Sequence, residues 1–121
     1  MHWTAKESRK QLMMYYIQQE RLTEAKALLN GLAEENAHVF YLKALLANAE
    51  LETELFERFA HKSFEMAQLT GEQQLSLDVA LLLCSSDKSK INYDFYSQYI
   101  SENATPGWRQ VNQEKLYGLN L

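Results

Sequence analysis

The sequence is poor in the residues that staple small proteins or build tight turns: it has one cysteine, one proline and four glycines. A lone cysteine cannot form a disulfide within the chain, so a disulfide-rich extracellular scaffold is excluded and a reducing compartment is favoured. This content of proline and glycine is too low for an all-β protein, whereas the strong helix formers Ala, Leu, Glu, Gln and Lys are abundant. The composition therefore predicts an all-α protein.

Long apolar segments and a surplus of positive charge are also missing. No apolar run approaches the ~20 residues of a membrane-spanning helix, and the polar start MHWTAKESRK lacks the apolar region of a signal peptide. The formal net charge is −4, whereas a nucleic-acid surface needs clustered Lys and Arg. These absences predict a cytoplasmic protein, or a detached domain of a larger one, with no nucleic-acid partner and no membrane insertion.

Apolar residues recur at helical spacing along most of the 121 residues, a length that suits one domain with its own core. Gly71 is a natural helix stop, and Thr105 before Pro106 is a typical helix start. We predict about seven short antiparallel helices, at residues 5–19, 21 to 34–36, 37–51, 55–70, 72–85, 90–102 and 106–117. In the first two helices the expected core residues are Leu12, Met13, Tyr16, Ala25, Leu29 and Leu32.

One spacing occurs twice: a small residue, a large one four positions on, and an apolar one three positions further. It is found as Ala25, Leu29 and Leu32 and again as Ala60, Phe64 and Ala67. The pattern resembles the second helix of a tetratricopeptide (TPR) repeat, whose period is close to 34 residues. Met13 departs from the small residue usual at its position in the first helix.

The resemblance implies a TPR-like right-handed superhelix of roughly three degenerate helix pairs in one domain. The repeat-like units would be residues 6–39, 40–74 and 75–105, followed by a C-terminal capping helix at 106–119. In the second unit two registers remain open, one using Tyr41, Ala44 and Ala47 and the other Ala44, Ala47 and Leu51. An unrelated α-helical bundle is the alternative.

Residues that could perform chemistry are few and isolated. Glu35 and His38 form one E-x-x-H, whereas a di-iron bundle needs two such motifs and two further Glu. Cys84 has no histidine close in sequence to activate it, so we expect a buried small apolar side chain. The glycines do not cluster as in a phosphate-binding loop. We predict no enzyme, no cofactor and no metal.

In stacked TPR-like pairs the first helix of each pair lines a concave face. Met14 and Ile17 are apolar where a solvated face should be polar, and methionine adapts readily to different partners. The alternative is that both pack on a neighbouring helix. The predicted partner-binding residues are Lys10, Met14, Ile17, Gln18, Tyr41, Leu45 and Asn48.

The resulting hypothesis is a non-catalytic protein–protein interaction module, such as an adaptor, a small chaperone or a partner-sensing domain. It would bind a peptide or helix on its concave face, and its net acidity favours a basic or neutral partner. Two alternatives remain open: a structural homodimerisation domain, and a regulatory domain of a larger transcriptional or membrane-associated protein.

Overall fold

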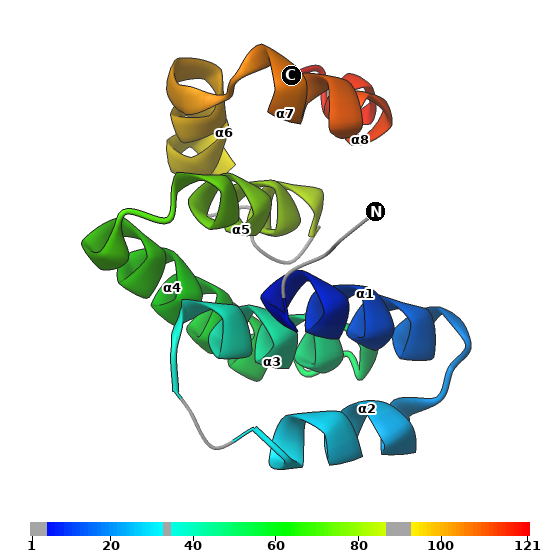
Figure 1. Ribbon diagram of the computed structural model, residues 1–121. Helices are drawn as coiled ribbons and strands as arrows, with labels where there is room; N and C mark the ends of the chain where they lie inside the picture. Colours follow the sequence, from blue (N-terminus) through cyan, green and yellow to red (C-terminus); the bar gives the residue numbers. More distant parts are fainter. Residues whose placement is uncertain (1–4, 33–34, 87–92) are drawn as a thin grey trace. The chain divides into compact units, whose positions relative to one another are not determined.

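The computed structural model describes residues 5–32, 35–86 and 93–121. Within these ranges the chain is all-α, as predicted, with eight helices and no strand (Figure 1). The helices are α1 (Ala5–Gln18), α2 (Leu22–Asn30), α3 (Ala37–Ala49), α4 (Thr53–Thr70), α5 (Gln73–Ser85), α6 (Tyr93–Asn103), α7 (Pro106–Val111) and α8 (Gln113–Gly118). The chain divides into two compact units, unit 1 (Met1–Ser63) and unit 2 (Phe64–Leu121), and the boundary falls within α4.

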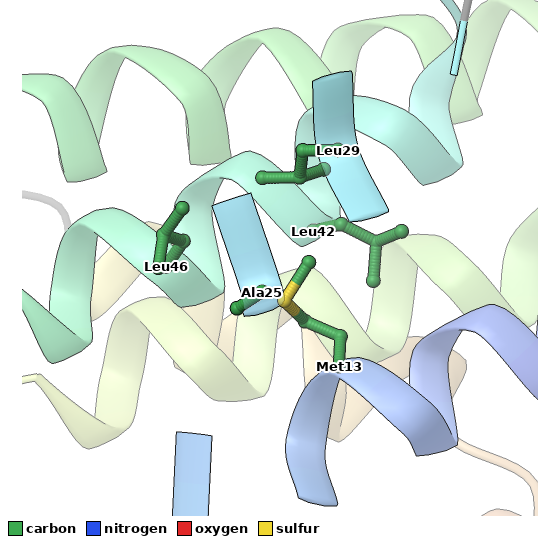
Figure 2. Close-up of a cluster of buried hydrophobic side chains, with 5 residues drawn as sticks. All are labelled: Met13, Ala25, Leu29, Leu42 and Leu46. Carbon is green, nitrogen blue, oxygen red and sulfur yellow. The ribbon is translucent and has the colours of Figure 1, made fainter. Parts of the chain in front are cut away.

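Unit 1 is built around the first three helices, each of which packs against the other two. Figure 2 shows Met13 reaching from α1 toward Ala25 on α2, and both side chains are fully buried. Leu29 of α2 and Leu42 and Leu46 of α3 complete this cluster. Because Ala25 is small, α1 and α2 can approach closely, and the longer side chains of α1 and α3 fill the space between the helices.

The face of α1 that points to the core differs from the prediction at one residue. Leu12 is 40% exposed, so its assignment to the core is wrong, whereas Met13 is fully buried. Successive residues of a helix are rotated by ~100°, so a narrow contact with α2 and α3 cannot bury both neighbours equally. Met13, Ala25 and Leu29 are confirmed as core residues, and Tyr16 and Leu32 are half-buried against the same cluster.

Four helices are followed by a residue in the left-handed backbone conformation. These residues are Glu20 after α1, Leu51 after α3, Gly71 after α4 and Asn120 after α8, with φ of 57°, 61°, 71° and 59°. In each case the following amide donates to a carbonyl five residues back, as from Glu52 to Ala47 at 2.9 Å, the hydrogen bond of a Schellman motif. Gly71 is confirmed as a helix stop. Leu51 is 74% exposed, whereas Tyr41, Ala44 and Ala47 are buried.

Most helix boundaries lie within two residues of the expected ones, and two helices differ by more. The second helix ends at Asn30 rather than at 34–36, because the low helix propensity of Asn30-Gly31 coincides with the reversal that leads to α3. The expected last helix is divided into two helices, α7 and α8, at Asn112. The side-chain amide of Asn112 donates to the Trp108 carbonyl at 3.0 Å, and such a hydrogen bond competes with those of the helix backbone. The expected start of the sixth helix, residues 90–92, lies outside the described residues.

Unit 2 holds its helices together with aromatic side chains. The Phe64 ring of α4 lies edge-on to the rings of Tyr96 and Tyr99 on α6, with both centroid distances 5.1 Å, a favourable geometry for aromatic pairs. Trp108 of α7 is buried and its Nε1 donates to Asp78 Oδ1 of α5 at 2.9 Å. α7 also begins as predicted, because the Thr105 hydroxyl accepts from the Trp108 amide at 3.2 Å.

Candidate functional site

The predicted binding residues lie on two helices that pack against each other, α1 and α3. Lys10, Met14, Ile17 and Gln18 are on α1, and the remaining three, Tyr41, Leu45 and Asn48, are on α3. The Lys10 Nζ lies 5.5 Å from the centroid of the Tyr41 ring, a cation–π distance. This contact joins the α1 members of the set to the α3 members.

The seven residues are not equally accessible. Gln18 and Asn48 are exposed, and Lys10 and Met14 are half-buried. Tyr41 is only 7% exposed, so its ring packs beneath the surface residues and leaves little area for a partner to contact. The other two, Ile17 and Leu45, are half-buried and pack against the core cluster of unit 1. For Ile17 the alternative interpretation, packing on a neighbouring helix, describes the contacts better, and Leu45 is held in the same way. A partner-binding role for the set stays a prediction.

The accessible members define what we call the α1–α3 surface: Lys10, Met14, Gln18 and Asn48. It offers one cation, one polarisable thioether and two carboxamides. Each carboxamide can both donate and accept hydrogen bonds, as a peptide backbone does, and the thioether adapts to apolar side chains. The surface therefore carries the groups needed to hold an extended segment or one face of a helix.

Unit 1 also contains a hollow of about 440 Å³ that the sequence did not predict. Its walls come from α2, α3 and α4 and from Leu32 and Glu35. Its lining residues are Lys26, Leu29, Asn30, Leu32, Glu35, Lys43, Leu46 and Phe59. None of them belongs to the predicted binding set. Leu29 and Leu46 are also members of the core cluster, so the hollow reaches an accessible edge of the apolar core.

The two lysines of the hollow are held in different ways. Lys26 Nζ forms an ion pair with Glu50 Oε2 at 2.7 Å, and this hydrogen bond and charge raise the pKa of Lys26. Lys43 Nζ lies over two aromatic rings, 5.1 Å from the Phe40 centroid and 5.7 Å from that of Phe59. Throughout the described ranges Lys43 has no carboxylate partner. The charge of Lys43 is therefore available to a ligand at the hollow, whereas the charge of Lys26 is already compensated by Glu50.

Sequence reasoning missed the hollow because its residues come from separate segments with unrelated patterns. Leu29 and Leu46 read as ordinary core positions, and Phe59 follows a helical stripe. The end of α2 at Asn30, earlier than the expected 34–36, leaves the space beside them. The local signals were Lys26 and Lys43, each one helical turn before a leucine of the hollow, Leu29 and Leu46, a spacing that places a cation beside an apolar side chain.

Chemistry outside these two surfaces is limited. Cys84 is 5% exposed, as expected for a small apolar residue, and burial raises the pKa of its thiol to about 11, which keeps it protonated and a poor nucleophile at neutral pH. No group of three or more His, Cys, Asp or Glu that could hold a metal ion occurs in the described part of the chain. None of the described helices is both long and apolar enough to cross a membrane.

Comparison with known proteins names no relative. No family model matches the chain, and neither a curated protein nor a solved structure matches it.

Proposed function

We propose that this chain is a TPR-like, non-catalytic protein–protein interaction module that binds a peptide or helix of a partner protein at the α1–α3 surface. The observation that carries the proposal is the contact between Lys10 and the Tyr41 ring at 5.5 Å. Together with the packing of α1 on α3, it makes residues from two helices parts of one surface. A partner can then contact both helices at once.

Two features of the packing support a repeat of helix pairs. In stacked repeats each pair buries its apolar face on the next, and α3 contacts both helices of the preceding pair, α1 and α2. The small residues of the recurring spacing, Ala25 and Ala60, are both fully buried. Within unit 2, α5 packs against α6, as the two helices of one pair would.

The surface should bind through shape and hydrogen bonds more than through charge. Lys10 is its single ionisable residue, and the cation already interacts with Tyr41. The amides of Gln18 and Asn48, both exposed, can pair with a partner backbone, while Met14 contacts an apolar side chain of the partner. Such contacts suit segments of many sequences with one apolar anchor.

The proposal is tested by placing a photo-crosslinking amino acid at Gln18 or Asn48 in the full chain, in the cells that make it. Thr23, exposed on α2, is the matched control position. We expect the same partner to be captured from both test positions and not from Thr23, and Met14→Glu to abolish capture while the far-UV circular dichroism is unchanged. Capture of a second copy of the chain would support the homodimer instead, and capture of nothing would refute the proposal.

A further inference from the structure

The hollow of unit 1 shares no residue with the α1–α3 surface and has its own chemistry. We propose that it is a second binding site, for a peptide segment of a partner protein in which a large apolar side chain lies next to an aspartate or glutamate. The apolar side chain would enter the hollow, and the acidic one would pair with Lys43.

The size and walls of the hollow suit one large apolar side chain and its flanking backbone. Its volume of about 440 Å³ lies within the range of roughly 300–1,000 Å³ that is typical of ligand sites. Leu29 and Leu46 are nearly fully buried, while Leu32 and Phe59 are half-buried. An apolar side chain seated among them would remove the accessible parts of Leu32 and Phe59 from water, which is favourable in proportion to the area covered.

The charge at the hollow favours an acidic residue next to the apolar side chain of the bound peptide. Lys43 keeps its ammonium group over the Phe40 and Phe59 rings, so the cation is already positioned at the apolar wall. Because its position is fixed before binding, little side-chain entropy is lost when a carboxylate arrives. Lys26 is occupied by Glu50 at 2.7 Å. The local charge thus favours an acidic segment although the whole chain is acidic, with a formal net charge of −4.

The polar lining residues favour a peptide over a free carboxylic acid. Asn30 and Glu35, both exposed, stand at the hollow beside its apolar residues. The Asn30 carboxamide can donate to and accept from a backbone, and the Glu35 carboxylate can accept a backbone N–H. A free carboxylic acid offers no N–H to Glu35. A segment with its acidic side chain at Glu35 would be repelled, so the carboxylate must lie on the side of Lys43.

The test is selection of short random peptides displayed on phage against the purified full chain, followed by titration of the enriched peptides by calorimetry. We expect the enriched sequences to place Asp or Glu within two positions of a large apolar residue. Lys43→Glu should weaken their binding by about tenfold or more, as loss of a charge-assisted contact predicts, and Lys43→Arg should retain it. Lys62→Glu, an exposed charge reversal on α4 outside the hollow, is the matched control and should leave binding unchanged.

A second measurement locates the bound peptide and guards against misfolding. In NMR spectra the enriched peptide should shift the backbone amides of Asn30, Lys43 and Phe59 and leave those of Gln18 and Asn48 in place. The inference is overturned if no peptide is enriched, if the enriched peptides are basic, or if Lys43→Glu with a native circular dichroism spectrum binds them as well as the wild type. Shifts confined to Gln18 and Asn48 would also overturn it, and would support the α1–α3 surface instead.

Discussion

Truncation of two adjacent residues of α1, Met13 and Leu12, tests which face of this helix forms the core. Both are large and apolar, but Met13 is fully buried and Leu12 is 40% exposed. We expect Met13→Ala to lower the free energy of unfolding of unit 1 much more than Leu12→Ala does. The comparison is well matched because both substitutions leave alanine, the best helix former, at neighbouring positions of one helix.

The expected losses in the free energy of unfolding follow from how deeply each side chain is buried. Truncation of a fully buried methionine to alanine costs about 2–5 kcal/mol, and we expect about 3 kcal/mol because Ala25, Leu29 and Leu42 surround Met13 on neighbouring helices and cannot all close the cavity. Full burial of a leucine is worth about 1.5–3 kcal/mol, so the partial burial of Leu12 makes its truncation cost about 1 kcal/mol. The difference of about 2 kcal/mol is roughly a 30-fold difference in the unfolding equilibrium constant.

Urea unfolding followed by far-UV circular dichroism measures both values. With a slope of about 1 kcal/mol/M for a unit of this size, the midpoint should fall by about 3 M for Met13→Ala and by about 1 M for Leu12→Ala. The chain divides into two compact units, so two transitions are possible and the one that responds belongs to unit 1. An equal or larger loss for Leu12→Ala would refute the assignment of the core face.

Four further substitutions test local interactions. Leu51→Gly should stabilise unit 1 by about 0.5–1 kcal/mol, because glycine relieves the left-handed backbone at φ 61°, whereas Gly71→Ala at φ 71° should cost about 1 kcal/mol; a loss of stability for Leu51→Gly or a gain for Gly71→Ala in urea unfolding would refute this. Trp108→Phe should cost unit 2 about 2 kcal/mol, because the hydrogen bond to the Asp78 carboxylate is lost, and an unchanged unfolding midpoint would contradict it. Burial raises the pKa of Cys84 from 9.0 to about 11 in the folded chain, so its contribution to stability is complete below pH 9.0 and is lost as the pH rises toward about 11. Urea unfolding at several pH values should show that Cys84→Ala loses less stability at alkaline pH than the wild type does. An identical dependence of stability on pH in the two proteins would contradict the raised pKa of the buried thiol.

Local interactions determined the features that the sequence predicted correctly. The all-α composition, the helix stop at Gly71 and the start at Thr105-Pro106 depend on backbone propensities and on hydrogen bonds within a few residues. The placement of the predicted binding residues on two helices likewise follows from their spacing. For the same reason Asn112 could have been read as an interruption, since its side chain bonds a carbonyl four residues back.

The tertiary structure decided what a single helix leaves open. Leu12 and Met13 are both apolar, and only the packing of α2 and α3 on α1 chose Met13 for the core. The same packing buried Tyr41, which reduces the predicted binding set to a smaller surface. The hollow exists only where α2 ends beside α3 and α4, so its residues share no pattern along the chain. Helical periodicity fixes which residues share a face, but the neighbours of that face determine whether it becomes core, support or binding surface.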